Sequence, residues 1–246
     1  MKKTYRDQAI VLRTSDLGEA DRIVTMYTRE HGKQRAVAKG VRKTSSRFGA
    51  RLEPFSFVDL QLYAGRNLDV VTQAESIAQY HRAIVADYDS YTAASALVET
   101  ADALNTEGEA DLGQFALLHG ALHAIAVSAH KPDLIVNSYI LRAMALSGWQ
   151  LAVFECAVCG APGPHQALNV SAGGAVCVDC RPAASLQPNL ETWALLGALS
   201  SGDWAVADAA ALPQRRSAGA IVAAYLQYQL EHGINSLRFV DSRLIG

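Results

Sequence analysis

Four cysteines, arranged as two close pairs, constrain the fold of this chain more than any other feature of its 246 residues. Cys156 and Cys159 form the first pair, Cys177 and Cys180 form the second, and seventeen residues separate the pairs. Each Cys-x-x-Cys turn directs two thiolates to one point, and two such turns complete the tetrahedral shell of a structural Zn²⁺ ion. The spacing therefore predicts one structural zinc ion per chain. The alternative is two redox Cys-x-x-Cys motifs.

A shell of four thiolates leaves no open position on the metal, so we expect the ion to stabilise the fold and not to catalyse a reaction. The sequence lacks the motifs of zinc deaminases, of P-loop nucleotide hydrolases and of Gly-x-Ser-x-Gly hydrolases. His119 and His123 are four residues apart on an apolar helical pattern, where packing is a better interpretation than metal chelation. We therefore expect no catalytic residue and no enzymatic activity.

The first 80 residues have the pattern of a small β-barrel. Ile, Val and Thr are concentrated in residues 9–13, 22–27 and 34–38, and residues 56–62 alternate between apolar and polar side chains. A turn over residues 64–67 leads to a fifth run at 68–72. Five short strands with an insert between the third and fourth predict an OB-fold, a barrel that binds oligonucleotides on one face.

The pattern becomes helical from about residue 80. Helices are expected over residues 83–104, from Asp111 as the cap to 130, from 131 to Ser147-Gly148, and over 185–209 and 217–231. The predicted fold class is therefore a multidomain α+β chain with an N-terminal OB-fold barrel. We expect an OB-fold domain at 1–80, a helical domain at 81–150, a four-cysteine zinc-binding segment at 151–184, and C-terminal helices at 185–246 that pack on the helical domain.

Charge is distributed unevenly along the chain. The net charge is −2 overall, but residues 1–80 carry +5 and residues 81–155 carry −6. Between Arg29 and Arg51 there are eight basic residues and one acidic residue, Glu30, with glycines and serines between them. Charge of one sign on a flexible backbone suits contacts with phosphates; the alternative is a solvated loop with no partner. The candidate DNA-binding residues, with Phe48 as the exposed aromatic for base stacking, are Lys33, Arg35, Lys39, Arg42, Lys43, Arg47, Phe48 and Arg51.

The N-terminus has no apolar segment of the kind found in signal peptides, and no apolar run is long enough to cross a membrane. We expect a cytoplasmic protein whose cysteines are reduced.

Several motifs in and around the basic stretch closely resemble the RecO family of bacterial recombination mediators. In chain order they are Glu19–Thr25 (EADRIVT), Gly32-Lys33, Ala36–Gly40 (AVAKG), Ser46–Gly49 (SRFG) and Leu52–Phe55 (LEPF). The cysteine quartet fits the family too, as does the C-terminal His232-Gly233 followed by Leu237-Arg238-Phe239. The resemblance covers essentially the whole chain, in the same order.

The resemblance implies an OB-fold, a helical domain, a zinc segment and no bond-making catalysis. It implies binding of single- and double-stranded DNA, annealing of complementary strands, and RecA loading onto DNA coated by single-strand-binding protein. The implied partners are RecR, the acidic C-terminal tail of single-strand-binding protein and RecF, and the implied location is the nucleoid. Arg142 is the candidate for docking that tail, because basic residues are scarce between 81 and 155. The competing interpretation is a zinc-stabilised scaffold whose basic loop binds acidic protein tails.

Overall fold

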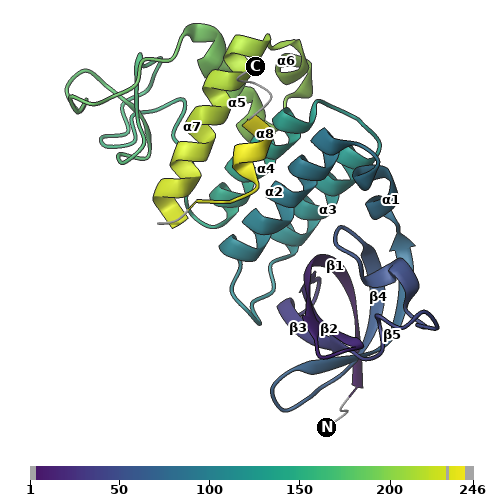
Figure 1. The fold of residues 1–246 in the computed structure, drawn as a ribbon. Coiled ribbons are helices and arrows are strands. Elements are labelled where there is room, and N and C mark those ends of the chain that lie inside the picture. The colour runs from purple at the N-terminus through teal and green to yellow at the C-terminus, as the bar shows by residue number, and fades with distance from the viewer. Residues whose placement is uncertain (1–3, 231–232, 242–246) are drawn as a thin grey trace.

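The computed structural model describes residues 4–230 and 233–241, with a barrel at one end of the molecule and helices above it (Figure 1). The barrel has five strands: β1 (Thr4–Leu17), β2 (Asp21–Thr28), β3 (Gly32–Ala38), β4 (Phe57–Tyr63) and β5 (Asp69–Ala78). They close in the order β1-β2-β3-β5-β4. All pairs are antiparallel except β3 with β5, which meet in parallel at Ala36–Asp69 and Val37–Val70. The predicted N-terminal OB-like barrel is confirmed.

The strands form because apolar residues alternate with polar ones, and the barrel interior takes every second side chain. Val24, Met26, Leu60 and Leu62 point inward and are fully buried. The connection from β3 to β4 contains a short 3₁₀ helix, η1 (Gly49–Leu52), and its apolar side chains join the same barrel core.

The remaining elements are mostly helices, as predicted. They are α1 (Tyr80–Val85), α2 (Tyr88–Leu104), α3 (Leu112–Ala126), α4 (Pro132–Leu146), α5 (Leu190–Ser201), α6 (Trp204–Ala209), α7 (Leu212–Leu230) and α8 (Leu237–Asp241). Asp111 caps α3 by accepting from the backbone N–H groups of Gly113 and Gln114, and Ser147 is the C-cap of α4, both as expected.

Four helix boundaries differ from expectation, and capping residues explain two of them. The helix expected from Asp111 to residue 130 ends earlier, at Ala126. The helix expected over 83–104 is two helices, because the side chain of Asp87 accepts from Ser90 N and begins α2. The helix expected over 185–209 begins after Asn189 and breaks at Gly202, whose φ of 78° lies in the left-handed region. The last long helix begins earlier than expected, at Leu212; residue 231, its expected end, lies outside the described residues.

The outer face of the barrel and the helices share one hydrophobic cluster, which is separate from the core inside the barrel. Outward-facing barrel residues, including Ile10, Leu12, Tyr27 and Phe57, pack into the same cluster as α2, α3, α4, α5 and α7. His119 belongs to this seam: its Nε2 lies 2.9 Å from the Tyr80 hydroxyl and its ring packs on Phe57. The barrel is therefore held against the helices by apolar packing.

In the chain between α4 and α5, the two cysteine pairs flank a small hairpin, β6 (Ala167–Asn169) and β7 (Gly174–Val176). Among the described residues, no helix is long and apolar enough to cross a membrane.

Candidate nucleic-acid interface and metal centre

The basic stretch forms β3 and the ordered connection that follows it on the outside of the barrel. Its backbone is fixed to the turn between β1 and β2: Gly40 N donates to Asp21 Oδ1 at 2.7 Å, and Arg42 N donates to Ala20 O at 3.0 Å. The candidate basic residues whose side chains are exposed are Arg35 on β3 and, in the connection, Lys39, Arg42, Lys43, Arg47 and Arg51. The positive charge is thus displayed by a structured surface.

The exposed cations differ in whether they already bind other groups of the protein. Arg42 forms an ion pair with Asp16 at 3.2 Å, and Arg51 donates to the carbonyl oxygens of Arg47 and Phe48. In contrast, within the described part of the chain no ion pair involves the side chains of Arg35, Lys39, Lys43 or Arg47. These four carry charge that a polyanion can neutralise.

Lys33 does not belong to this surface, which corrects the expectation from sequence. Its ammonium lies 3.2 Å from Asp102 Oδ1 on α2 and donates to the Asp102 carbonyl at 2.6 Å, while Arg13 contacts the other carboxylate oxygen at 2.8 Å. Burial opposes ionisation of Asp102, but the hydrogen bonds from Arg13 and Lys33 outweigh it and lower the Asp102 pKa. Lys33 therefore joins the barrel to the helices.

A glycine makes this junction possible. Beside Lys33, Gly32 lies so close to the loop before α3 that a Cβ on it would come within 1.9 Å of the Glu109 carbonyl oxygen. Gly108 N also donates to the Lys33 carbonyl at 2.9 Å. The Gly32-Lys33 motif is thus explained by contact between the two halves of the molecule.

Phe48 is also misassigned by the sequence interpretation, because its side chain is only 1 % exposed. It packs with Leu52 into the barrel core, and the Arg47 guanidinium lies over its ring, 5.0 Å from the centroid. In this conformation its ring is not available to stack on a base. The spacing of Phe48 and Leu52, four residues apart in an otherwise polar segment, was the signal for burial.

We expect Phe48→Ala to lower the free energy of unfolding by about 3–5 kcal/mol, because it leaves a cavity in the small barrel core. Urea denaturation measures this loss. Phe154→Ala is the matched control, since Phe154 is 73 % exposed and its removal should change stability by about 0.5 kcal/mol or less. Unchanged stability combined with weakened DNA binding would restore Phe48 as a stacking residue.

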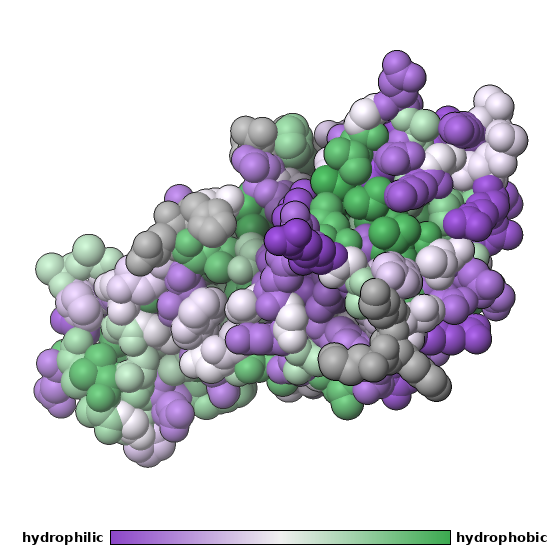
Figure 2. All heavy atoms as spheres, turned by 90° about the horizontal axis from the view of Figure 1, so that it is seen from below, coloured by the Kyte–Doolittle hydropathy of each residue, from purple (hydrophilic) through white to green (hydrophobic). Residues whose placement is uncertain are grey.

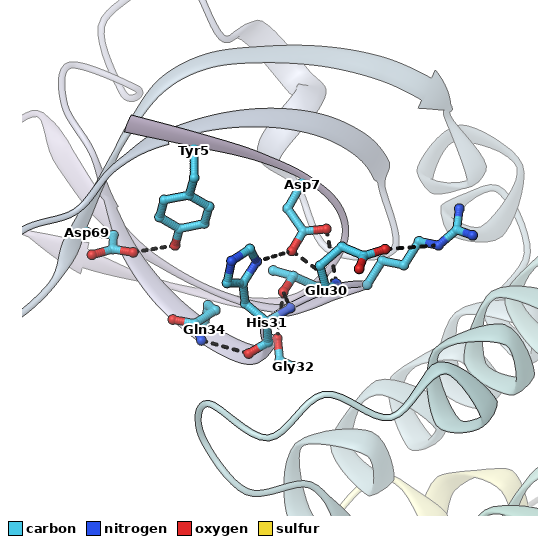
Figure 3. A network of polar contacts seen from close by, with 9 residues as sticks. Tyr5, Asp7, Glu30, His31, Gly32, Gln34 and Asp69 are labelled. Carbon is cyan, nitrogen blue, oxygen red and sulfur yellow. Dashed lines mark hydrogen bonds and ion pairs between the residues drawn. The ribbon is translucent and has the colours of Figure 1, made fainter. Parts of the chain in front are cut away.

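The sequence interpretation missed a polar network at the β2–β3 turn (Figure 3). This turn lies at the other end of β2 from the β1–β2 turn that holds the basic connection. Asp7, whose side chain is 1 % exposed, accepts from Glu30 N at 3.1 Å and lies 2.6 Å from His31 Nδ1. The His31 ring packs on Tyr5, and the Tyr5 hydroxyl donates to Asp69. Burial and the Asp69 carboxylate raise the pKa of Tyr5. The network fixes the β2–β3 turn against β1, so its role is structural.

The four cysteines come together as a candidate metal centre. All four sulfurs lie within 4.8 Å of one another, and the Sγ atoms of Cys159 and Cys177 are 3.8 Å apart. A tetrahedral site with metal–sulfur bonds of about 2.3 Å has ligand–ligand edges of about 3.8 Å, so the donor set fits a tetrahedral ion. Among the described residues, this is the one group of metal-binding side chains found close together.

The electrostatics of the cluster also favour a bound cation. Backbone N–H groups of Cys159 and Cys177 lower the pKa of the Cys156 thiol to about 6, and so stabilise a thiolate. The neighbouring sulfurs of Cys177 and Cys159 raise the pKa of Cys180 to about 12. Four thiols this close cannot all ionise unless a positive charge is placed among them. A divalent ion would supply that charge.

The first cysteine pair lies on a tight backbone turn beside the β6–β7 hairpin. Gly160 N donates to the Cys156 carbonyl at 2.8 Å, and Ala157 N donates to the Ala175 carbonyl at 2.8 Å. Gly174 is required here, because a Cβ on it would lie 2.2 Å from the Ala152 carbonyl oxygen. The hairpin turn expected at Gly173-Gly174 is present, with β7 beginning at Gly174.

Arg142 lines a cavity of about 660 Å³ between α3, α4 and the start of α6. Small apolar residues, among them Ala116 and Ala121, line much of it. Tyr139 also lines it, and its buried hydroxyl has no hydrogen-bond partner within the described structure. His130 lies on the same cavity and stacks on Trp204, with ring centroids 3.9 Å apart. The cavity thus combines an apolar lining with one exposed cation.

Comparison with known proteins gives matches along nearly the whole chain. The family model described as "Recombination protein O N terminal" matches residues 1–80, and "Recombination protein O C terminal" matches residues 85–238. A protein named "DNA repair protein RecO" from Thermobifida fusca is 53 % identical over 238 residues, covering 96 % of this chain and 98 % of its own. Proteins of the same name from Nocardioides sp. and Streptomyces coelicolor are 52 % and 49 % identical, each over 96 % of this chain and 99 % and 98 % of their own.

Proposed function

The chain belongs to the RecO family of DNA repair proteins, and we propose that it binds single- and double-stranded DNA and anneals complementary strands. In the same proposal it works with RecR, and with RecF, at the nucleoid to help RecA replace single-strand-binding protein on gapped DNA. The observation that carries the proposal is the ordered basic surface of the barrel, where Arg35, Lys39, Lys43 and Arg47 are exposed.

Annealing by this surface requires no bond-making residue. Two DNA backbones must approach each other with their repulsion neutralised, while their bases remain free to pair. Lysine and arginine side chains neutralise phosphates and release the counterions condensed on them. In this proposal the barrel lowers the electrostatic barrier to pairing, and the protein is not an enzyme.

Binding to a bare oligonucleotide at two salt concentrations tests this function. If about four phosphates are contacted, the logarithm of the binding constant falls with the logarithm of salt concentration with a slope near −3 for single strands. A zinc-stabilised scaffold that recognises only acidic protein tails would not bind the oligonucleotide. Absence of salt-dependent binding would therefore overturn the proposed function.

We propose Zn²⁺ as the metal of the four-cysteine centre. Zinc prefers a tetrahedral thiolate shell, and a shell completed by Cys156, Cys159, Cys177 and Cys180 leaves no position for a substrate. The ion would join the two halves of the cysteine segment and contribute to folding.

We place the docking of the acidic tail of single-strand-binding protein in the cavity beside Arg142. An acidic tail with apolar side chains needs a cation next to an apolar surface, and this cavity offers both. Acidic residues elsewhere in α2 and the following loop give the helical half a negative net charge, so a local cation is required to attract a carboxylate.

We expect Arg142→Glu to weaken binding of a labelled acidic peptide by about 10- to 100-fold, because a hydrogen bond to a charged group is worth about 1.5–3 kcal/mol and is replaced by repulsion. Fluorescence anisotropy measures the change. Arg181→Glu, an equal charge change at an exposed arginine of the cysteine segment, is the matched control and should leave peptide binding intact. Equal effects of the two variants would contradict this location.

A further inference from the structure

A row of apolar side chains, half-buried except for the exposed Tyr63 at one end, crosses the outer face of the barrel. Ile23 on β2 lies directly opposite Val37 on β3, Val37 lies opposite Val70 on β5, and Val70 lies opposite Tyr63 on β4. Directly opposed residues share a face of the sheet. Their sequence neighbours Val24, Ala36, Val71 and Leu62 are fully buried inside the barrel, so the row points outward.

This row lies beyond the part of the barrel that the helices cover. Further along the same face of β2, Tyr27 is fully buried and its ring packs near Phe115 of α3. Tyr63, at the far end of the row, is 39 % exposed. Seen from below, the barrel half of the molecule shows hydrophobic residues beside strongly hydrophilic ones (Figure 2). An apolar row that meets solvent in this way is available to a ligand.

Cations flank the row along β3. Arg35 and Val37 are two residues apart on β3, so their side chains share the outer face at a spacing of about 7 Å, and Lys39 follows directly after the end of the strand. Both cations are exposed. By contrast, Arg6 on β1 forms an ion pair with Asp59 on β4, with its Nε 2.7 Å from the Asp59 Oδ1. The charge around the row is therefore positive and unneutralised on its β3 side.

We propose that this row receives the unpaired bases of single-stranded DNA, with Tyr63 as the stacking residue and Arg35 and Lys39 holding phosphates on either side of Val37. The proposal rests on the function proposed above and assigns it a strand preference. Duplex DNA presents phosphates and hides the faces of its bases, so it contacts the cations and leaves the row unused. Single strands offer both, and aromatic stacking tolerates any base sequence.

The test compares oligothymidylate with an abasic oligonucleotide of the same length, so that the number of phosphates is constant. We expect Tyr63→Leu to weaken binding of oligothymidylate about 5- to 100-fold, to leave abasic binding unchanged, and to keep the salt slope. Tyr63→Phe retains the ring and should bind as the parent protein does. Tyr228→Leu, which removes a 52 % exposed tyrosine on α7, is the matched control.

Three outcomes would overturn the inference while the proposed function survives. They are equal binding of the two oligonucleotides by the parent protein, unchanged oligothymidylate binding by Tyr63→Leu, and loss of binding by Tyr63→Phe. If the parent protein binds neither oligonucleotide, the proposed function fails first. If Tyr63→Leu loses only an acidic peptide, the row is a protein contact and the inference is wrong.

Discussion

Replacing Arg35, Lys39, Lys43 and Arg47 together with alanine is expected to weaken binding to single-stranded DNA by about 10³- to 10⁴-fold at 50 mM salt. Each phosphate contact on a single strand contributes about 0.7 to the salt slope, which corresponds to about 0.9 logarithmic units at that salt concentration. Four lost contacts therefore remove between three and four orders of magnitude and flatten the salt dependence. Anisotropy titrations at several salt concentrations measure both effects.

The fold should survive these four changes, because none of the side chains forms an ion pair within the described structure. Arg42 is left in place because its pairing with Asp16 attaches the basic connection to the end of β1. The control is the double variant Arg82→Ala/Arg181→Ala, which removes exposed positive charge elsewhere. Retained affinity in the quadruple variant, or an equal loss in the control, would show that the barrel surface is not the DNA site.

The barrel and the cysteine cluster could be predicted from sequence because their signals are local. Alternation over residues 56–62 depends only on which face of a strand is buried, and the structure places β4 there. The cysteine spacing is similarly restrictive, since two Cys-x-x-Cys turns bring four sulfurs to one point almost regardless of the surrounding fold.

Phe48 and Lys33 are less exposed than the sequence indicates, because burial depends on contacts between distant segments. Phe48 belongs to a basic, glycine-containing run, yet the barrel interior accepts it from the β3–β4 connection. Lys33 meets Asp102, which is 69 residues further along the chain. Likewise, only the register of β4 against β5 places Tyr63 at the end of the apolar row on the outer face. Local patterns do not determine such long-range pairings.

Replacing Cys156 or Cys180 with serine is expected to release the metal and to lower the melting temperature before DNA binding changes. The hairpin of this segment has strands of only three residues each, so it has little core of its own. Structural zinc contributes apparent binding free energies of about 10–16 kcal/mol to small zinc domains. Loss of about 4 kcal/mol would lower the melting temperature of a chain of this length by about 8–16 °C. Metal analysis and calorimetry on the same samples measure the two effects.

Loss of the metal should destabilise the helices that pack on the cysteine segment as well as the segment itself. It should leave the basic surface of the barrel unchanged. Leu168 of the hairpin is fully buried in the core shared with α5 and α7, so unfolding of the segment exposes that core. The basic surface with Arg35, Lys39, Lys43 and Arg47 belongs to the barrel, which lies at the other end of the molecule from the cysteine segment in Figure 1. We therefore expect these four residues to keep their positions. Val178→Ser is the matched control, because Val178 lies between two ligands yet is 92 % exposed and has no metal-binding atom in its side chain. Freshly purified protein without zinc, or a Cys180→Ser variant whose DNA binding falls in parallel with its melting temperature, would refute a purely structural metal.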